Sequence, residues 1–214
     1  MEKTTKKTIA LIGGSQGVGL ECLKIILKSE QFNLKVLVRN PSKLKEFEND
    51  KNLEIVKGDI LDSKKVEETI INSDAVINSL GSNLSENFDI CSKGTSVLIN
   101  EMKKCGVDRI ITCSSLGVGD SYSKCGYFTR FIIWSFLSKA IADKDIQEDT
   151  IKKSGLKYII VRPPQLVDWG YTGKYRVGYD VSGGKISRSD VADWIVKNVF
   201  SDEYVGKTPS IVSV

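Results

Sequence analysis

The stretch TIALIGGSQGVGLECLKIILKS, residues 8–29, joins a short apolar run to a segment of helical spacing through a glycine-rich turn. A turn without Cβ atoms can be tight, and it lets an anion approach the amides and the positive dipole end of the following helix. The stretch therefore predicts a β-turn-α unit that binds a pyrophosphate; the alternative is a turn that only packs the helix onto the sheet. The candidate contacts in this turn are Gly13, Ser15, Gln16, Gly17 and Val18.

The rest of the chain repeats this alternation. Further apolar runs of strand length are found at 34–38, 53–57, 75–79, 109–113 and 157–161. Helical segments lie between most of them, at 62–72, 90–106 and 138–155, the last two ending at Gly106 and Gly155 as left-handed cap residues. Continuous apolar strands that alternate with helices predict a parallel sheet covered on both faces. We therefore expect a doubly wound α/β fold in a single domain, residues 1–214.

The C-terminal third departs from this pattern, and from about residue 165 it is expected to contribute the substrate side. Residues 167–186 are rich in Gly and Tyr and predict irregular chain with a hairpin. A helix is expected from Ser187, which would be its N-cap, with Asp190 completing a variant of the capping box. A last short strand at 209–214 would close the edge of the sheet.

Composition narrows the functional classes. The 214 residues are 41% apolar and 27% charged, with a formal net charge of +4, which is typical of a soluble globular protein. The cluster MEKTTKK at the start predicts a solvated terminus and not a nucleic-acid-binding arm. The apolar segment 127–142 contains Arg130 and Lys139 and is too short to span a membrane. We expect neither a nucleic acid nor a membrane as partner.

The cysteines point to a reducing compartment. Five cysteines occur without a C-x-x-C pair, and the chain has no histidine, so no metal site is expected. No apolar signal-peptide region precedes the first strand. We interpret the thiols as reduced and expect a cytoplasmic protein.

The residues after the second strand favour one coenzyme. Folds that bind NAD place a carboxylate about 20 residues after the glycines, where it holds the ribose 2′-hydroxyl. Arg39 occupies that position, and no carboxylate occurs between Leu34 and Lys45. Arg39, Ser42 and Lys43 would instead surround a 2′-phosphate, which predicts NADP as the cofactor. The alternative for Arg39 is a solvated surface arginine.

The residues that follow the later strands converge on the same edge of the sheet, because the carboxyl ends of parallel strands meet there. Asp59 and Ile60 would lie beside the adenine, and Leu80 and Gly81 under the dinucleotide. Ser114 and Ser115 would lie near the nicotinamide.

Several motifs together resemble a known family. They are GGSQGVG, VLVRNPSK, GDIL, DRIITCSSLGVGDS, ADKDIQE and SGLKYIIVRPPQL followed by TGKYR, and they extend from about Thr8 to Val212. The sequence resembles the atypical short-chain dehydrogenase/reductases, in particular the NAD(P)H-binding group that contains biliverdin-IXβ reductase/flavin reductase and the NmrA-like proteins. This resemblance implies a monomeric Rossmann-type domain that binds NADPH and reduces flavins, quinones or tetrapyrroles. It adds Pro163 and Pro164, at the end of a strand, as residues that flank the nicotinamide.

The substrate side departs from that family. Relatives that use a catalytic tyrosine carry it four residues before the lysine, where this chain has Ala140 before Lys144. The flavin and biliverdin reductases carry histidines where Asp145 and Gln165 stand. Reduction of a flavin or quinone delocalises the hydride's charge over a ring system, so solvent can supply the proton afterwards. Ser115 and Lys144, with Tyr122 or Tyr127, suit this chemistry without a tyrosine–lysine pair.

Three alternatives stay open at this point. Lys144 either contacts a ribose and eases charge on the acceptor, or pairs with Glu148 on the helix surface. Phe128, Phe131, Trp134 and Phe136 either cap a planar acceptor or pack in the core. The protein is either an NADPH-dependent oxidoreductase acting on a flavin, quinone or related conjugated acceptor, or a non-catalytic NADP-binding sensor of the NmrA-like kind.

Overall fold

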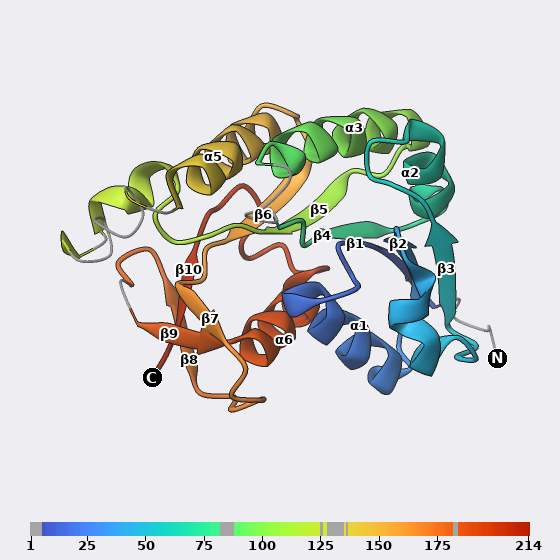
Figure 1. The fold of residues 1–214 in the computed structure, drawn as a ribbon, viewed down its shortest axis with the longest axis horizontal. Helices are drawn as coiled ribbons and strands as arrows, with labels where there is room; N and C mark the ends of the chain where they lie inside the picture. The colour runs from blue at the N-terminus through green and yellow to red at the C-terminus, as the bar shows by residue number, and fades with distance from the viewer. Residues whose placement is uncertain (1–5, 82–87, 125, 128–134, 136, 182–183) are drawn as a thin grey trace.

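The predicted apolar runs form one parallel sheet in the computed structural model (Figure 1). Its order is β3-β2-β1-β4-β5-β6, so the direction of winding reverses between β1 and β4. The structure describes residues 6–81, 88–124, 126–127, 135, 137–181 and 184–214. The strands are β1 (Thr8–Ile12), β2 (Asn33–Val38), β3 (Leu53–Lys57), β4 (Ala75–Asn78), β5 (Arg109–Cys113) and β6 (Lys157–Val161).

Helices cover both faces of this sheet, as the alternation predicts. Helices α1 (Gly17–Ser29) and α6 (Arg188–Asn198) pack together on one face. The opposite face carries α2 (Ser63–Ile70), α3 (Ile90–Cys105) and α5 (Ser138–Lys152), as Figure 1 shows. Every residue of β4 is buried, because both faces of this central strand are covered. The doubly wound α/β fold is confirmed.

Two glycines near helix ends adopt the left-handed conformation. Gly106 is the C-cap of α3, with a φ of 71°, and its amide bonds the Met102 carbonyl. Gly155 also has a positive φ, but α5 ends earlier, with Lys153 as its C-cap. The predicted end of α3 is therefore confirmed, and that of α5 is displaced.

A buried carboxylate fixes α5 against α3. The oxygens of Asp143, on α5, each accept one hydrogen bond at 2.9 Å, from the amides of Cys91 and Ser92. These amides belong to the first turn of α3, whose own N-cap, Asp89, makes no side-chain capping bond. Asp143 thus satisfies the helix N-terminus from a distant part of the chain and fixes the two helices relative to each other.

The C-terminal third is built differently from the prediction. It contains β7 (Gln165–Val167), β8 (Tyr175–Gly178), β9 (Lys185–Ser187) and β10 (Ser210–Ser213). The predicted hairpin is wrong, because β8 pairs with β10 and β9 pairs in parallel with β7. The sequence could not show this, since each strand has its partner far along the chain.

The predicted edge strand is partly right. Before β10 begins, the chain runs along β6, where the Ile160 amide bonds the Lys207 carbonyl and the Arg162 amide bonds the Pro209 carbonyl. The last strand then turns away and pairs with β8 in a separate two-stranded sheet. The backbone of residues 206–211 therefore covers the β6 edge without becoming a strand of the main sheet.

Helix α6 begins where the sequence predicts, but only one of its two predicted caps is correct. The Ser187 hydroxyl accepts a hydrogen bond from the Ser189 amide, which confirms it as N-cap. Asp190 does not complete a capping box. Its buried carboxylate accepts from the Thr172 amide and hydroxyl and from the Gly173 amide, at 2.7–2.9 Å. Asp190 thus anchors the loop between β7 and β8.

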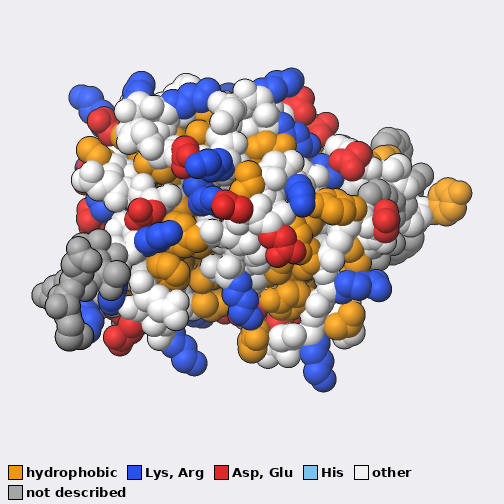
Figure 2. Space-filling model, turned by 180° about the vertical axis from the view of Figure 1, so that it is seen from behind, with side chains coloured by type: hydrophobic (Ala, Val, Ile, Leu, Met, Phe, Trp, Pro, Cys, Tyr) orange, Lys and Arg blue, Asp and Glu red, His pale blue; other side chains and the backbone are white. Residues whose placement is uncertain are grey.

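Two predictions concern surfaces and thiols. No helix in the described ranges has the length and apolar character needed to cross a membrane. On the face seen in Figure 2, positive and negative side chains are interspersed. Cys22 and Cys113 are buried free thiols and Cys105 is a partly buried one. Cys125 and the four aromatic residues of the predicted cap (Phe128, Phe131, Trp134 and Phe136) lie outside the described residues.

Replacing Asp190 by Ala removes the acceptor of three hydrogen bonds in the loop. We expect the free energy of unfolding to fall by about 2–3 kcal/mol, because buried donors lose a charged partner. Urea denaturation measures the change. Asp149→Ala is the matched control, because its carboxylate is exposed and, within the described part of the chain, pairs only with Lys153. It should change the free energy of unfolding by about 0.5 kcal/mol or less. Equal effects of the two substitutions would contradict the anchoring role.

Candidate functional site

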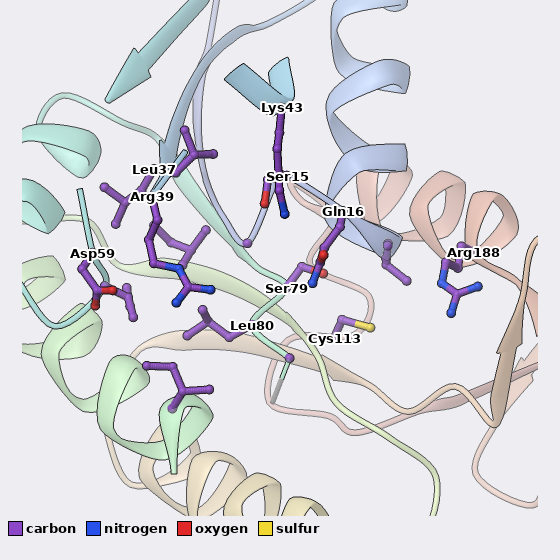
Figure 3. A pocket seen from close by; sticks show the side chains of 18 of the residues that line it. Ser15, Gln16, Leu37, Arg39, Lys43, Asp59, Ser79, Leu80, Cys113 and Arg188 are labelled. Atoms are coloured by element: carbon purple, nitrogen blue, oxygen red, sulfur yellow. The ribbon is translucent and has the colours of Figure 1, made fainter. Parts of the chain in front are cut away.

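A cavity of about 380 Å³ opens at the carboxyl ends of the strands, beside the turn that joins β1 to α1 (Figure 3). It lies where the strand order reverses between β1 and β4, which is where ligands bind in open α/β sheets. Its walls come from segments far apart in the sequence, from the glycine turn to the start of α6.

Most of the predicted site residues line this cavity. They are Gly13, Ser15, Gln16, Gly17, Val18, Arg39, Lys43, Asp59, Ile60, Leu80, Gly81, Ser114 and Lys144. Ser42, Ser115 and Pro163 are not among the lining residues. The Ser42 hydroxyl donates to Asn40, and the Ser115 hydroxyl donates to the Leu116 carbonyl. Pro163 is buried and accepts a hydrogen bond from the Leu116 amide. Contacts of these three with a dinucleotide stay predictions.

The glycine turn is closed by packing. A Cβ on Gly13 would lie 2.5 Å from the Ser79 carbonyl oxygen, and one on Gly19 would lie 2.2 Å from the Gly13 carbonyl oxygen. Both positions therefore require glycine for the fold alone. Gly17 is different, because its φ is +59° and no described backbone atom outside its chain neighbours and its own helix lies within 4 Å of a Cβ placed on it. Of the three glycines, only Gly17 leaves open space beside the cavity.

The first turn of α1 presents unused donors. Its first intrahelical hydrogen bond runs from the Leu20 amide to the Gln16 carbonyl, so the amides of Gly17, Val18 and Gly19 have no acceptor within the helix. The Gln16 side chain makes no capping bond either. Free amides at a helix N-terminus beside an open cavity fit a pyrophosphate.

Two cations, Arg39 and Lys43, line the cavity shortly after the end of β2. Arg39 and Lys43 are exposed, and among the described residues no carboxylate pairs with either of them. The nearby Asp59 carboxylate instead accepts a hydrogen bond from the Leu61 amide at 2.9 Å. A pair of unneutralised cations at a cavity wall is suited to bind an anionic group.

Lys144 is held at the floor of the cavity. Its ammonium donates to the Cys113 carbonyl at 3.1 Å and to the Leu80 carbonyl at 3.3 Å. The alternative of a pair with Glu148 is wrong, because Glu148 is buried and bonded elsewhere. An ammonium has three donors, so one N–H of Lys144 is left for a ligand.

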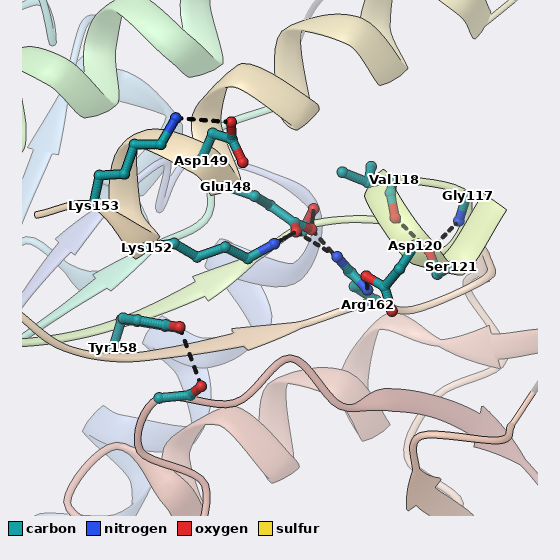
Figure 4. Close-up of polar contacts among 12 residues, drawn as sticks. Gly117, Val118, Asp120, Ser121, Glu148, Asp149, Lys152, Lys153, Tyr158 and Arg162 are labelled. Carbon is teal, nitrogen blue, oxygen red and sulfur yellow. Dashed lines mark hydrogen bonds and ion pairs between the residues drawn. The ribbon is translucent and has the colours of Figure 1, made fainter.

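A buried ionic network underlies this floor (Figure 4). The Arg162 guanidinium binds both Glu148 oxygens, with Nε 2.9 Å from Oε1 and Nη2 2.6 Å from Oε2. Ser114 donates to Oε1 at 2.7 Å, and Lys152 donates to Oε2 at 3.0 Å. A third guanidinium nitrogen of Arg162 binds Asp120 at 2.7 Å. The network connects the carboxyl ends of β5 and β6 to α5.

The surroundings of Glu148, Ser114 and Cys113 determine which of these groups carries a proton and which can donate one. Burial alone raises the pKa of Glu148, but the hydrogen bonds and charge of Arg162, with Ser114 and Lys152, outweigh it and hold this pKa below its ordinary value. Because Glu148 takes the only hydroxyl proton of Ser114, Ser114 offers lone pairs and no donor to the cavity. Burial also raises the pKa of Cys113 to about 11, so this wall residue is a neutral thiol.

Some lining residues were missed by sequence reasoning. They are Ile12, Leu37, Val38, Gly58, Ser79, Ile90, Cys113, Leu166 and Arg188. Most are ordinary strand-end residues that carry no chemical signal. Arg188 is the exception, because it is a cation at the first position of α6 and lies across the cavity from Arg39 (Figure 3). Its distance in sequence from the glycine turn concealed it.

The other positions discussed for the substrate are more open. Ala140 is half-buried on α5, and Asp145 and Gln165 are exposed. Tyr122 and Tyr127 are exposed, Tyr127 to 91%. None of these five residues lines the described cavity.

Comparison with known proteins agrees with this geometry. The chain matches the NAD(P)H-binding family over residues 13–202. An uncharacterised chloroplast protein of Arabidopsis thaliana is 26% identical over 221 residues, which cover 99% of this chain and 79% of that protein. Among solved structures, ChuY, an anaerobillin reductase of Escherichia coli O157:H7, superimposes with a TM-score of 0.83 at 23% identity, over 97% of each chain. A short-chain dehydrogenase/reductase of Veillonella parvula in complex with NADP has a TM-score of 0.84 at 12% identity, covering 98% of this chain and 95% of its own.

The fold and the cavity thus define a Rossmann-type protein with a cavity that fits a dinucleotide. The chain belongs to the NAD(P)H-binding family. The resemblance predicted from the sequence is thus confirmed for the NAD(P)H-binding family and for the fold. The residues of the glycine turn fit such a ligand, as their open space and free amides show.

Glu148→Gln removes the buried charged partner of Arg162 and leaves it only the exposed carboxylate of Asp120. We expect the free energy of unfolding to fall by about 3–5 kcal/mol at neutral pH. Since the pKa of Glu148 is lowered on folding, its contribution is complete above about pH 4.5, its unfolded value, and is lost as the pH falls through the lower folded value. The difference between the unaltered protein and the variant should therefore narrow on acidification.

Urea denaturation over a pH series measures this difference. Glu54→Gln is the matched control, because Glu54 is 56% exposed and lies 3.6 Å from Lys35. It should change the free energy of unfolding by about 1 kcal/mol or less. A difference between the unaltered protein and Glu148→Gln that stays constant from neutral pH to pH 3 would contradict the charged pair.

Proposed function

We propose that the protein is an NADPH-dependent oxidoreductase that transfers a hydride to a flavin, a quinone or a related conjugated acceptor. One observation carries the proposal: the floor of the cavity holds a fixed ammonium, Lys144, beside a serine that cannot donate. No tyrosine precedes Lys144 at the usual spacing, because Ala140 is there. The name of ChuY, a reductase, agrees with this reaction class, although at 23% identity the likeness itself shows only the fold.

The choice of NADPH rests on Arg39 and Lys43. Both are cavity-wall cations without a carboxylate partner among the described residues, and the strand that precedes them ends without an acid. A 2′-phosphate would neutralise them, whereas NADH would leave both cations unpaired.

The chemistry follows from the donors that the floor offers. When bound, NADPH supplies the hydride. The remaining N–H of Lys144 would bind a ribose hydroxyl or a developing negative charge on the acceptor. Ser114 would accept from an amide N–H, since its own proton is given to Glu148. Because neither Ser114 nor Ala140 can donate a proton as a catalytic tyrosine would, we infer an acceptor that tolerates delayed protonation by solvent, as a conjugated ring does.

A second candidate function is a dinucleotide sensor without turnover. The observation that favours it is that Ala140, Asp145 and Gln165 stand where the catalytic relatives described above carry a tyrosine and histidines. NADP occupancy would then control a partner. The planar acceptor, the monomeric state and the cytoplasmic location stay predictions that accompany the first candidate.

Arg39→Asp tests the coenzyme. We expect NADPH binding to weaken by about tenfold or more and the preference over NADH to narrow or reverse, because a charge-assisted contact to the 2′-phosphate becomes a repulsion. Calorimetric titration with both coenzymes measures it. Lys45→Asp makes a similar change of charge at an exposed position outside the cavity wall and should leave both affinities unchanged. Equal affinity of the unaltered protein for NADH and NADPH would refute the choice.

Lys144→Ala tests the reaction class. We expect kcat/KM for flavin or quinone to fall tens to hundreds of times, about 2–3 kcal/mol of positioning and charge stabilisation. NADPH oxidation, followed by its own absorbance with flavin, quinone and ketone acceptors in parallel, measures this. Lys153→Ala, at the exposed end of α5, is the control. The rate should show no steep titration near neutral pH, since the chain has no histidine.

Two outcomes of the same assay would contradict the proposal. Strong activity on plain ketones alone would mean that a proton donor has been overlooked. Tight NADPH binding with no activity on any acceptor would favour the sensor. Ala140→Tyr should aid ketone reduction, if it aids any, and leave flavin reduction nearly unchanged.

A further inference from the structure

Arg188 is a cation on the wall of the cavity, on the opposite side from Arg39 (Figure 3). Its Nε lies 3.9 Å from the point that a Cβ on Gly17 would occupy, and it is the only described atom within 4 Å of that point outside the chain neighbours and the helix backbone. The guanidinium therefore borders the open space in front of the first turn of α1. The 2′-phosphate of the proposed coenzyme would lie at the other end, near Arg39.

The packing of α6 against α1 fixes this position. Arg188 is the first residue of α6, immediately after the N-cap Ser187. The next residue, Ser189, donates its hydroxyl to the Glu21 carboxylate of α1 at 2.9 Å. The backbone of Arg188 is thus held beside the glycine turn from two sides, by the cap and by the contact between the helices.

Asp168 orients the guanidinium. Nη1 of Arg188 lies 2.8 Å from a carboxylate oxygen of Asp168, which is 83% exposed. Among the described residues, Asp168 is the only partner of this guanidinium. Nη1 is therefore occupied, while Nε lies beside Gly17, the first residue of α1. A guanidinium and a helix N-terminus that border the same space are suited to bind one anionic group.

We propose that Arg188 binds the pyrophosphate of the dinucleotide together with the amides of Gly17 and Val18, and that Asp168 is its positioning residue. This role deepens the cofactor site and rests on dinucleotide binding to the cavity, not on the hydride acceptor. The pyrophosphate is common to NADPH and NADH. Arg188 consequently contributes to affinity for both coenzymes, whereas Arg39 and Lys43 contribute only to their discrimination.

Calorimetric titration of Arg188→Gln with four ligands tests the proposal without any acceptor. We expect NADPH, NADH and ADP-ribose, which all contain a pyrophosphate, to bind about tenfold more weakly. Adenosine 2′-monophosphate, which lacks it, should bind as to the unaltered protein. Arg39→Gln should show the reverse pattern, with loss for NADPH and adenosine 2′-monophosphate and little change for NADH and ADP-ribose.

Further variants make the assignment specific. Arg188→Lys retains the charge and should lose less affinity than Arg188→Gln. Asp168→Ala should weaken the three pyrophosphate ligands severalfold, and should have no further effect once Arg188 is Gln. Arg176→Gln removes the same charge from an exposed residue of β8 outside the cavity and should change none of the four affinities.

Three results would overturn the proposal. One is a loss for NADPH alone, which would assign Arg188 to the 2′-phosphate. Another is a loss for adenosine 2′-monophosphate equal to that for ADP-ribose, which would mean a general structural effect. The third is unchanged affinity for all four ligands. Absence of turnover with every acceptor would count only against the proposed reaction, because these titrations contain none.

Discussion

The bonds between Glu148 and Arg162 join more of this molecule than any other side-chain interaction described above. Two charges that are almost completely buried would be costly apart, and they are compensated only because Ser114, Lys152 and Asp120 complete the set of hydrogen bonds. The members of this set lie on α5, directly after β5 and β6, and in the short helical turn that follows β5. These hydrogen bonds hold the carboxyl ends of β5 and β6 in a fixed position relative to α5. Lys144 lies on α5 one helical turn before Glu148, so the floor of the cavity depends on the same contacts.

The glycine turn illustrates how a binding motif and a packing requirement coincide. Gly13 and Gly19 are required because the turn closes against Ser79 and against itself. Only Gly17 leaves space on the ligand side. The three glycines look equivalent in the sequence. In the structure Gly13 and Gly19 build the turn, whereas Gly17 leaves space beside the cavity. The packing interpretation is therefore confirmed at Gly13 and Gly19, and the binding interpretation stays a prediction at Gly17.

The sequence predicted the six central strands closely, because each is a continuous apolar run that both faces of the sheet bury. Helices α1 and α3 also lie where the sequence predicts, because the glycine turn before α1 and the cap residue Gly106 after α3 are local signals. The failures share one cause, which is a partner distant in the chain. Asp190 looks like a capping residue until Thr172 and Gly173 are brought to it, and β8 looks like half of a hairpin until β10 pairs with it. Lys144 was predicted to lie at the site, but its carbonyl partners were not predictable, and Arg188 had no local signal.

The backbone of residues 206–211, which runs along β6, matters for how the protein folds during its synthesis. A parallel sheet with an open edge strand offers unpaired amides and carbonyls to any other extended chain. During synthesis β6 leaves the ribosome before residues 206–211. The nascent protein therefore passes through a stage in which the backbone amides and carbonyls at the β6 edge are unpaired and exposed. The same segment that completes the native molecule therefore also ends its period of greatest vulnerability to aggregation.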